Sequence, residues 1–108
     1  MNKRIIILDS CLKELKKLPL NLQKDFQVIA VELNKGIKLS LPLSRPMPSI
    51  GKGVHELRLN DGSGHYRIIY YLQAKANDIY FLHAFKKKTQ TTSKKNLDLA
   101  KRRLKGIQ

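Results

Sequence analysis

Three consecutive lysines, Lys86 to Lys88, follow an apolar segment that ends at Phe85. Neighbouring ammonium groups repel one another, and their burial is costly unless anions accompany them. Where a rigid strand presents such lysines beside arginines of neighbouring strands, a polyanion is the natural counter-charge. A lysine run at a strand end is equally typical of an ordinary solvated surface. The residues beside it therefore decide between the two interpretations.

A pair of arginines lies in a predicted β-hairpin upstream of the lysines. Two alternating segments, 54–60 and 65–73, flank the turn sequence Asp61-Gly-Ser-Gly64. Such a turn predicts a tight hairpin, and its geometry fixes which residues pair across the two strands. With the turn centred on Gly62 and Ser63, Arg58 stands directly opposite Arg67.

Like charges directly opposed across two strands are destabilising, so the Arg58–Arg67 pair is a local conflict of the kind expected at functional sites. A guanidinium fork matches phosphate oxygens and stays charged, which suits both arginines to bind a phosphate. The structural alternative is that Glu56, diagonal to Arg67, neutralises it. We favour an anion site over this alternative.

The composition also favours an anionic partner. Lysine and arginine number 22 against 8 acidic residues, a net charge of +14. Residues 1–85 carry 13 basic and 7 acidic side chains, whereas residues 86–108 carry 9 and 1. Nucleic acid is the commonest partner of so basic a domain. No basic amphipathic helix with an aromatic face indicates a membrane surface, whereas an acidic protein partner is compatible with nucleic-acid binding.

Other classes of chemistry find little support. The single Cys11 excludes an internal disulfide and a multi-cysteine metal site, and we interpret it as a packing residue. We find no nucleophilic triad, phosphate-binding glycine loop or metal-ligand cluster, so we expect no metal and no cofactor. The apolar run near the N-terminus is too short for a signal peptide, and no stretch approaches a membrane span. These features predict a cytoplasmic protein.

The elements that position the basic residues predict an α+β fold. The expected order is β-α-α-β-β-β-α, with a helix hairpin on a mostly antiparallel sheet, in one domain over residues 1–108. Asp9 or Ser10 can cap the first helix, Asn21 the second, and Thr92 or Ser93 the last. The proline-containing segment 37–51 is predicted to be a loop. The remaining predicted elements are strands at 5–8, 54–60, 65–73 and 79–85.

With these residues identified, the chain resembles the RelE/HigB superfamily of small bacterial toxins, in its phage-related HigB-like branch. Three stretches carry the resemblance: Val54–Leu59 (VHELRL), Gly64–Tyr70 (GHYRIIY) and Leu82–Thr89 (LHAFKKKT). Each is weak alone, but their order and spacing are fairly specific. The resemblance implies the toxin of a type II toxin–antitoxin pair, a metal-independent endonuclease that cuts mRNA in the ribosomal A site and is held by an antitoxin, typically a helix-turn-helix protein.

The resemblance also implies roles for particular residues. Arg58 matches the arginine that stabilises the cleaved phosphate, and Arg67 matches the arginine of a Tyr-Arg pair in the next strand. Lys86 and Lys87 fall where the family places basic residues after the last strand, and Lys52 resembles loop residues that grip RNA. Lys88 extends the same basic run.

The proton-transfer residue is not fixed by the sequence, because no tyrosine follows Tyr80, whereas many relatives carry a tyrosine or histidine there. Lys87 suits the role if neighbouring cations lower its pKa. His83 and His65 are rivals, although we interpret His83 as a core residue and His65 as solvated. Tyr71 shares the face of Arg67 and is predicted to stack on a base or to pack within the sheet; His55 is interpreted as structural.

Three functions therefore stay open. The first is a ribosome-dependent mRNA endonuclease. The second is a ParE-like topoisomerase poison on the same fold, which would leave the opposed arginines and the lysine run without a use. The third is a non-catalytic basic module that binds RNA or ribosomes.

Overall fold

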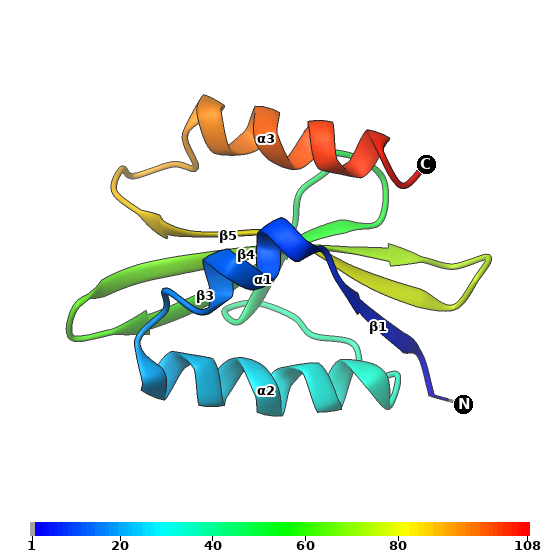
Figure 1. Ribbon diagram of the computed structural model, residues 1–108, viewed down its shortest axis with the longest axis horizontal. Helices are drawn as coiled ribbons and strands as arrows, with labels where there is room; N and C mark the ends of the chain where they lie inside the picture. The colour runs from blue at the N-terminus through cyan, green and yellow to red at the C-terminus, as the bar shows by residue number, and fades with distance from the viewer. Residues whose placement is uncertain (1) are drawn as a thin grey trace.

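Figure 1 shows the computed structural model, which describes residues 2–108. Within them, five strands form one sheet in the order β1-β5-β4-β3-β2. β1 is parallel to β5, and the other neighbouring strands are antiparallel. The elements in chain order are β1 (Arg4–Ile7), α1 (Asp9–Leu15), α2 (Leu20–Asn34), β2 (Ser44–Pro46), β3 (Val54–Asp61), β4 (Gly64–Gln73), β5 (Asp78–Lys87) and α3 (Lys94–Lys105).

The helices cover both faces of this sheet, with α2 on one side and α3 on the other (Figure 1). On the α2 side, Phe26 packs edge-on against Phe81, with ring centroids 4.8 Å apart. On the α3 side, buried Ala100 and Leu104 belong to a second apolar cluster. Successive strand residues alternate between the two faces, so the second cluster takes Ile69 from β4 while the first takes its neighbours. The α+β class is confirmed, with helices on both faces of the sheet.

The register of the β3–β4 hairpin is the predicted one. Asp61 pairs with Gly64 around a two-residue turn, and Arg58 pairs directly with Arg67. Asp61 Oδ1 accepts hydrogen bonds from the backbone nitrogen of Ser63 at 2.8 Å and from its hydroxyl at 2.6 Å. These bonds fix the turn, and the turn fixes the opposition of the two arginines.

β5 is longer than the sequence predicted, because Lys86 and Lys87 pair with Tyr66 and His65 of β4. Two of the three lysines of the run thus belong to the sheet and not to the following loop. Lys87 consequently projects from a rigid strand, on the same face as Arg67.

Two local predictions were wrong. Segment 37–51 contains the edge strand β2, which the prolines concealed; Pro46 is tolerated there because an edge strand needs no ladder donor on its open side. Neither predicted N-cap of the helix hairpin is used, since Leu8 and Pro19 precede α1 and α2 without side-chain caps, and Asn21 lies inside α2. By contrast, Ser93 caps α3 and accepts a hydrogen bond from the backbone of Asn96.

Candidate functional site

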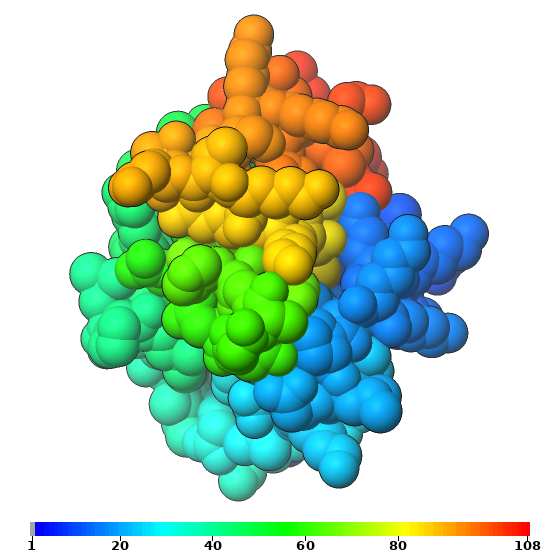
Figure 2. Space-filling model, turned by 90° about the vertical axis from the view of Figure 1, so that its left-hand side faces the viewer, coloured from blue at the N-terminus to red at the C-terminus, as the bar shows by residue number. Residues whose placement is uncertain are grey.

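A groove of about 630 Å³ lies where the end of β5 meets the β3–β4 hairpin. Figure 2 views this end of the molecule, with the green hairpin tip directly below the yellow end of β5 and the loop that follows it. The groove face of the sheet is the one that α3 covers further along. The lining residues are Arg58, Asn60, His65, Arg67, Lys87, Lys88, Thr89 and Gln90.

The groove is strongly electropositive. Two arginines and two lysines line it, and none of the described residues that line it is acidic. The strand register explains this concentration, because Arg58 stands opposite Arg67, and His65 stands opposite Lys87. Cations held this close together on rigid strands create a positive potential that attracts anions.

Arg67 is the buried member of this group, only 3% exposed. Its Nη1 donates to the backbone oxygen of Tyr66 at 3.0 Å and, more weakly, to Asn60 Oδ1 at 3.4 Å. Its Nε lies 3.6 Å from Glu56 Oε1, which is too long for a hydrogen bond, and has no hydrogen-bond partner among the described residues. Burial lowers the pKa of Arg67, the charge of Glu56 opposes this shift, and Arg58 adds to it.

Glu56 is thus the counter-ion that the sequence offered as an alternative to an anion site. Its carboxylate, 3% exposed, faces Arg67 and accepts a hydrogen bond from the Thr92 hydroxyl at 2.6 Å. One carboxylate neutralises one arginine, which leaves Arg58, Lys87 and Lys88 without an ion pair among the residues described. Glu56 therefore neutralises Arg67, as the structural alternative supposed, and an anion site at the neighbouring cations stays a prediction.

Lys87 has an unusual electrostatic environment. Partial burial lowers its pKa below that of an ordinary lysine, and the nearby charges of Arg67, Arg58 and Arg45 lower it further, against the opposing charge of Glu56. A lysine that deprotonates more readily is a better proton acceptor near neutral pH. The sequence predicted that neighbouring cations lower the pKa of Lys87, although it did not identify Arg45 as one of them.

His65 lines the groove beside Lys87 and is exposed, as expected. Its Nδ1 lies 2.6 Å from Asn60 Oδ1, the same oxygen that faces Arg67. Because an amide oxygen only accepts, Nδ1 is the donor in this hydrogen bond, and Nε2 is the ring nitrogen that can accept a proton in the corresponding neutral tautomer. The groove thus holds two groups that can accept a proton, Lys87 and His65.

Comparison with known proteins places this groove on a familiar fold. The family model "Phage derived protein Gp49-like (DUF891)" matches residues 13–105. The chain belongs to this family. No curated protein matches the sequence.

Solved structures share the fold. A mutant of the Escherichia coli toxin RelE in the free state is 14% identical, with a TM-score of 0.70 and complete coverage of both chains. The Mycobacterium tuberculosis toxin–antitoxin complex RelBE2 is 16% identical, with a TM-score of 0.60 over 81% of this chain and 100% of that one. The intact E. coli RelBE complex is 18% identical, with a TM-score of 0.57 over 81% and 99%. The Gp49-like family and the RelE fold confirm the resemblance to the RelE/HigB superfamily in its phage-related branch.

Three predicted RNA-binding residues lie outside the lining of this groove. Lys86 points to the other face of β5, where its ammonium lies 5.9 Å from the centre of the Tyr66 ring. Tyr71 is partly buried and stacks on Tyr80, with ring centroids 6.2 Å apart. Lys52 is exposed just before β3, six residues along the chain from Arg58. Their roles in RNA binding stay predictions.

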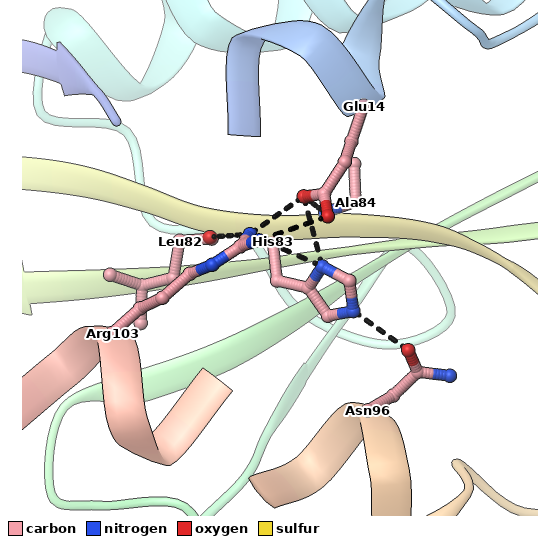
Figure 3. A network of polar contacts seen from close by, with 6 residues as sticks. All are labelled: Glu14, Leu82, His83, Ala84, Asn96 and Arg103. Atoms are coloured by element: carbon pink, nitrogen blue, oxygen red, sulfur yellow. Dashed lines mark hydrogen bonds and ion pairs between the residues drawn. The ribbon is translucent and has the colours of Figure 1, made fainter. Parts of the chain in front are cut away.

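A second polar cluster joins α1, β5 and α3 (Figure 3). Glu14 Oε1 lies 2.9 Å from His83 Nδ1 and accepts from Arg103 Nη1 at 2.7 Å, while His83 Nε2 lies 2.7 Å from Asn96 Oδ1. Burial raises the pKa of Glu14, but hydrogen bonds from Arg103 and His83 outweigh it, and the net shift is downward. We call Glu14, His83, Asn96 and Arg103 the Glu14 network. It confirms His83 as a satisfied core residue.

Two other sequence interpretations agree with the structure. Cys11 is fully buried, and burial raises the pKa of its thiol to about 12, so it is a packing residue and not a nucleophile. His55 stacks on Tyr70, with ring centroids 5.3 Å apart, as a structural residue. Among residues 2–108, no group of three histidine, cysteine or acidic side chains is arranged to hold a metal, and no helix is long and apolar enough to cross a membrane.

Proposed function

We propose that this chain is the toxin of a type II toxin–antitoxin pair, a metal-independent endonuclease that cuts mRNA on the ribosome in the cytoplasm. The observation that carries the proposal is the groove on a RelE fold, whose described lining has four basic side chains and no carboxylate. A single-stranded RNA backbone has the negative charge that complements such a groove.

The proposed chemistry is attack of a ribose 2′-hydroxyl on the adjacent phosphate. This reaction needs a proton acceptor, stabilisation of the charged phosphorane and a proton donor for the leaving oxygen. Arg58, whose guanidinium has no ion pair among residues 2–108, stabilises the phosphorane. Arg67, held by Glu56, adds positive charge behind it, and Lys88 holds the flanking backbone. Lys87 moves a proton, with His65 as the rival for this role.

The proposed partner is an antitoxin that covers or distorts the basic groove. Two of the structural neighbours are toxin–antitoxin complexes, and a net charge of +14 favours fast, salt-sensitive association with an acidic surface. A helix-turn-helix protein encoded beside this chain is the expected candidate. If the purified neighbour forms no complex at low salt, the toxin–antitoxin assignment loses its main support.

Induced expression in cells tests the function directly. We expect growth arrest, with new mRNA ends inside translated regions, and no such ends after induction of the Arg58→Ala variant. Arrest with intact mRNA and trapped topoisomerase–DNA complexes would instead identify a ParE-like poison. Binding to ribosomes without any mRNA breaks would identify a non-catalytic module.

A further inference from the structure

A second pocket, of about 370 Å³, adjoins the basic groove. The two cavities share three lining residues, Arg58, Lys87 and Gln90. A ligand strand that binds in the groove can therefore continue past Arg58 and Lys87 into the second pocket. We call this second cavity the β2 pocket, because residues of β2 and the turn after it form one of its walls.

The walls of the β2 pocket differ in chemistry. Four apolar residues line it: Pro46, Met47 and Pro48 from the end of β2 and the turn after it, and Leu97 from α3. The loop between β5 and α3 supplies polar groups, among them Gln90 and Thr91. An apolar surface beside polar side chains, at the mouth of a cationic groove, matches a nucleobase, which has apolar faces and hydrogen-bonding edges.

The pocket is built on ordered elements. Met47 is partly buried against the α3-side core, and its backbone nitrogen donates to the Val54 oxygen at 2.8 Å. Buried Glu56 lines the same pocket and accepts from the Thr92 hydroxyl at 2.6 Å, which ties the loop to β3. Both oxygens of Glu56 face protein partners, so this carboxylate positions the loop and Arg67 and does not read a base.

We infer that the β2 pocket binds the nucleobase of one nucleotide that flanks the scissile phosphate of a single-stranded RNA. The inference rests on the proposed function and extends it, since the groove holds the phosphate and the β2 pocket holds a neighbouring base. Met47 and the two prolines contact the face of the base, while Gln90 and Thr91 face its edge. This pocket then contributes to the sequence preference of cleavage.

The test uses ribosomes programmed with an mRNA that carries a 2′-deoxy nucleotide at the cleavage site, which blocks the reaction. The affinity of the full-length protein is compared between this mRNA and versions with an abasic nucleotide on either side of the site. Loss of one stacked base weakens binding of the wild type by about tenfold. Only one of the two abasic positions shows this loss.

Variants of residues that line the β2 pocket test whether the pocket causes the abasic penalty. Met47→Ala should reduce the abasic penalty to about twofold, whereas the volume-conserving Met47→Leu retains it. Ser49→Trp fills the pocket from an exposed position and abolishes the penalty without a change in the core. Val31→Ala, an exposed apolar truncation on α2, is the matched control and keeps the full penalty.

The outcomes separate this inference from the proposed function. If the unblocked mRNA is cleaved and Arg58→Ala stops the cleavage, the proposed function stands. An abasic penalty that is absent from the wild type, or equal in Ser49→Trp and Val31→Ala, then overturns the β2 pocket alone. Weaker antitoxin binding by Ser49→Trp with an unchanged abasic penalty assigns the pocket to the protein partner and also overturns it. A wild type that neither binds nor cleaves the mRNA refutes both.

Discussion

The basic groove and the Glu14 network are built from similar residues and differ in how their charges are satisfied. Both contain arginine, histidine and asparagine side chains near β5, but a glutamate belongs to the Glu14 network, whereas none of the described residues that line the groove is acidic. In the Glu14 network, Arg103 Nη1 donates both to Glu14 Oε1 at 2.7 Å and to the Leu82 oxygen at 2.8 Å. At the groove, Glu56 faces Arg67 from outside the lining, and the remaining cations have no ion pair among residues 2–108.

Residue type alone therefore does not identify a functional site. A buried polar cluster whose donors and acceptors find protein partners gains specificity and stability, but it has no capacity left for a ligand. A cluster with surplus charge of one sign is destabilising until an anion binds. The Glu14 network therefore holds α3 on the sheet, while the groove keeps positive charge that no carboxylate of its described lining neutralises. Mutations in the two clusters should affect different properties.

The largest effect is expected for Arg58→Ala. Loss of a guanidinium that binds the phosphorane should slow cleavage about a hundredfold to a thousandfold, since its interaction is strongest in the transition state. Stability should change little, because Arg58 makes no ion pair in the described residues. Single-turnover cleavage of ribosome-bound mRNA at saturating protein measures the rate, with circular dichroism as the folding control. If Arg58→Ala cleaves at the wild-type rate at saturation, Arg58 contributes only electrostatic binding and does not take part in catalysis.

Lys87→Ala is expected to slow cleavage by about a hundredfold, the lower range for a group that transfers a proton. Lys87→Arg keeps the positive charge but does not deprotonate near neutral pH, so it should not restore the rate. If Lys87 is the proton acceptor, the wild-type rate rises with pH and levels above its lowered pKa, and the arginine variant lacks this rise. Full activity of Lys87→Arg, with a pH profile that His65→Gln removes, would transfer the role to His65.

The opposed arginines of the groove could be predicted from the sequence, whereas the Glu14 network could not, for physical reasons. The two-residue turn at Gly62 and Ser63 fixed the opposition of Arg58 and Arg67, because strand register propagates from a hairpin turn. By contrast, Glu14 lies 69 residues from His83, and no local pattern indicates that pair. Only tertiary packing brings α1, β5 and α3 to one point.

The contribution of β2 also could not be predicted. Arg45 lies in a three-residue edge strand that ends at Pro46, so neither alternation nor length marked it as a strand. Its strand pairing with Glu56 brings a further cation to the β2 pocket, which adjoins the groove. Asn60 was missed for another reason, because its contacts with His65 and Arg67 depend on side-chain directions at the hairpin end.

Glu14→Ala tests the Glu14 network, where a smaller effect is expected, on stability and not on cleavage. It leaves Arg103 and His83 without their shared acceptor, which should lower the free energy of unfolding by about 2 kcal/mol. Cleavage at saturating protein should stay within about twofold of wild type, because the network lies outside the groove lining. Urea denaturation followed by circular dichroism measures the stability. A large loss of cleavage by a folded Glu14→Ala would show that the two clusters are coupled.

The same network predicts an acid dependence of stability. The folded-state pKa of Glu14 is lowered by Arg103 and His83, so its stabilising contribution is present above its unfolded pKa of about 4.3. The contribution is lost as the pH falls through the lower folded-state value. Glu14→Gln lacks this component, and the stabilities of the two proteins should converge on acidification below about pH 4. A difference in the free energy of unfolding between the two proteins that stays constant from about pH 3 to about pH 7 would contradict the assignment.

The smallest effects are expected on the exposed face of α3, which is basic but belongs to neither cluster. Arg102→Ala or Lys105→Ala removes one charge from the general field and should weaken RNA binding about twofold to threefold at low salt. The loss should fade as salt rises, because screening removes distant contributions first, whereas the defect of Arg58→Ala persists at saturation. Affinity for programmed ribosomes across a salt series measures both. An equal, salt-independent loss of cleavage in Arg102→Ala and Arg58→Ala would extend the site to α3 and abolish the distinction between the groove and the surrounding field.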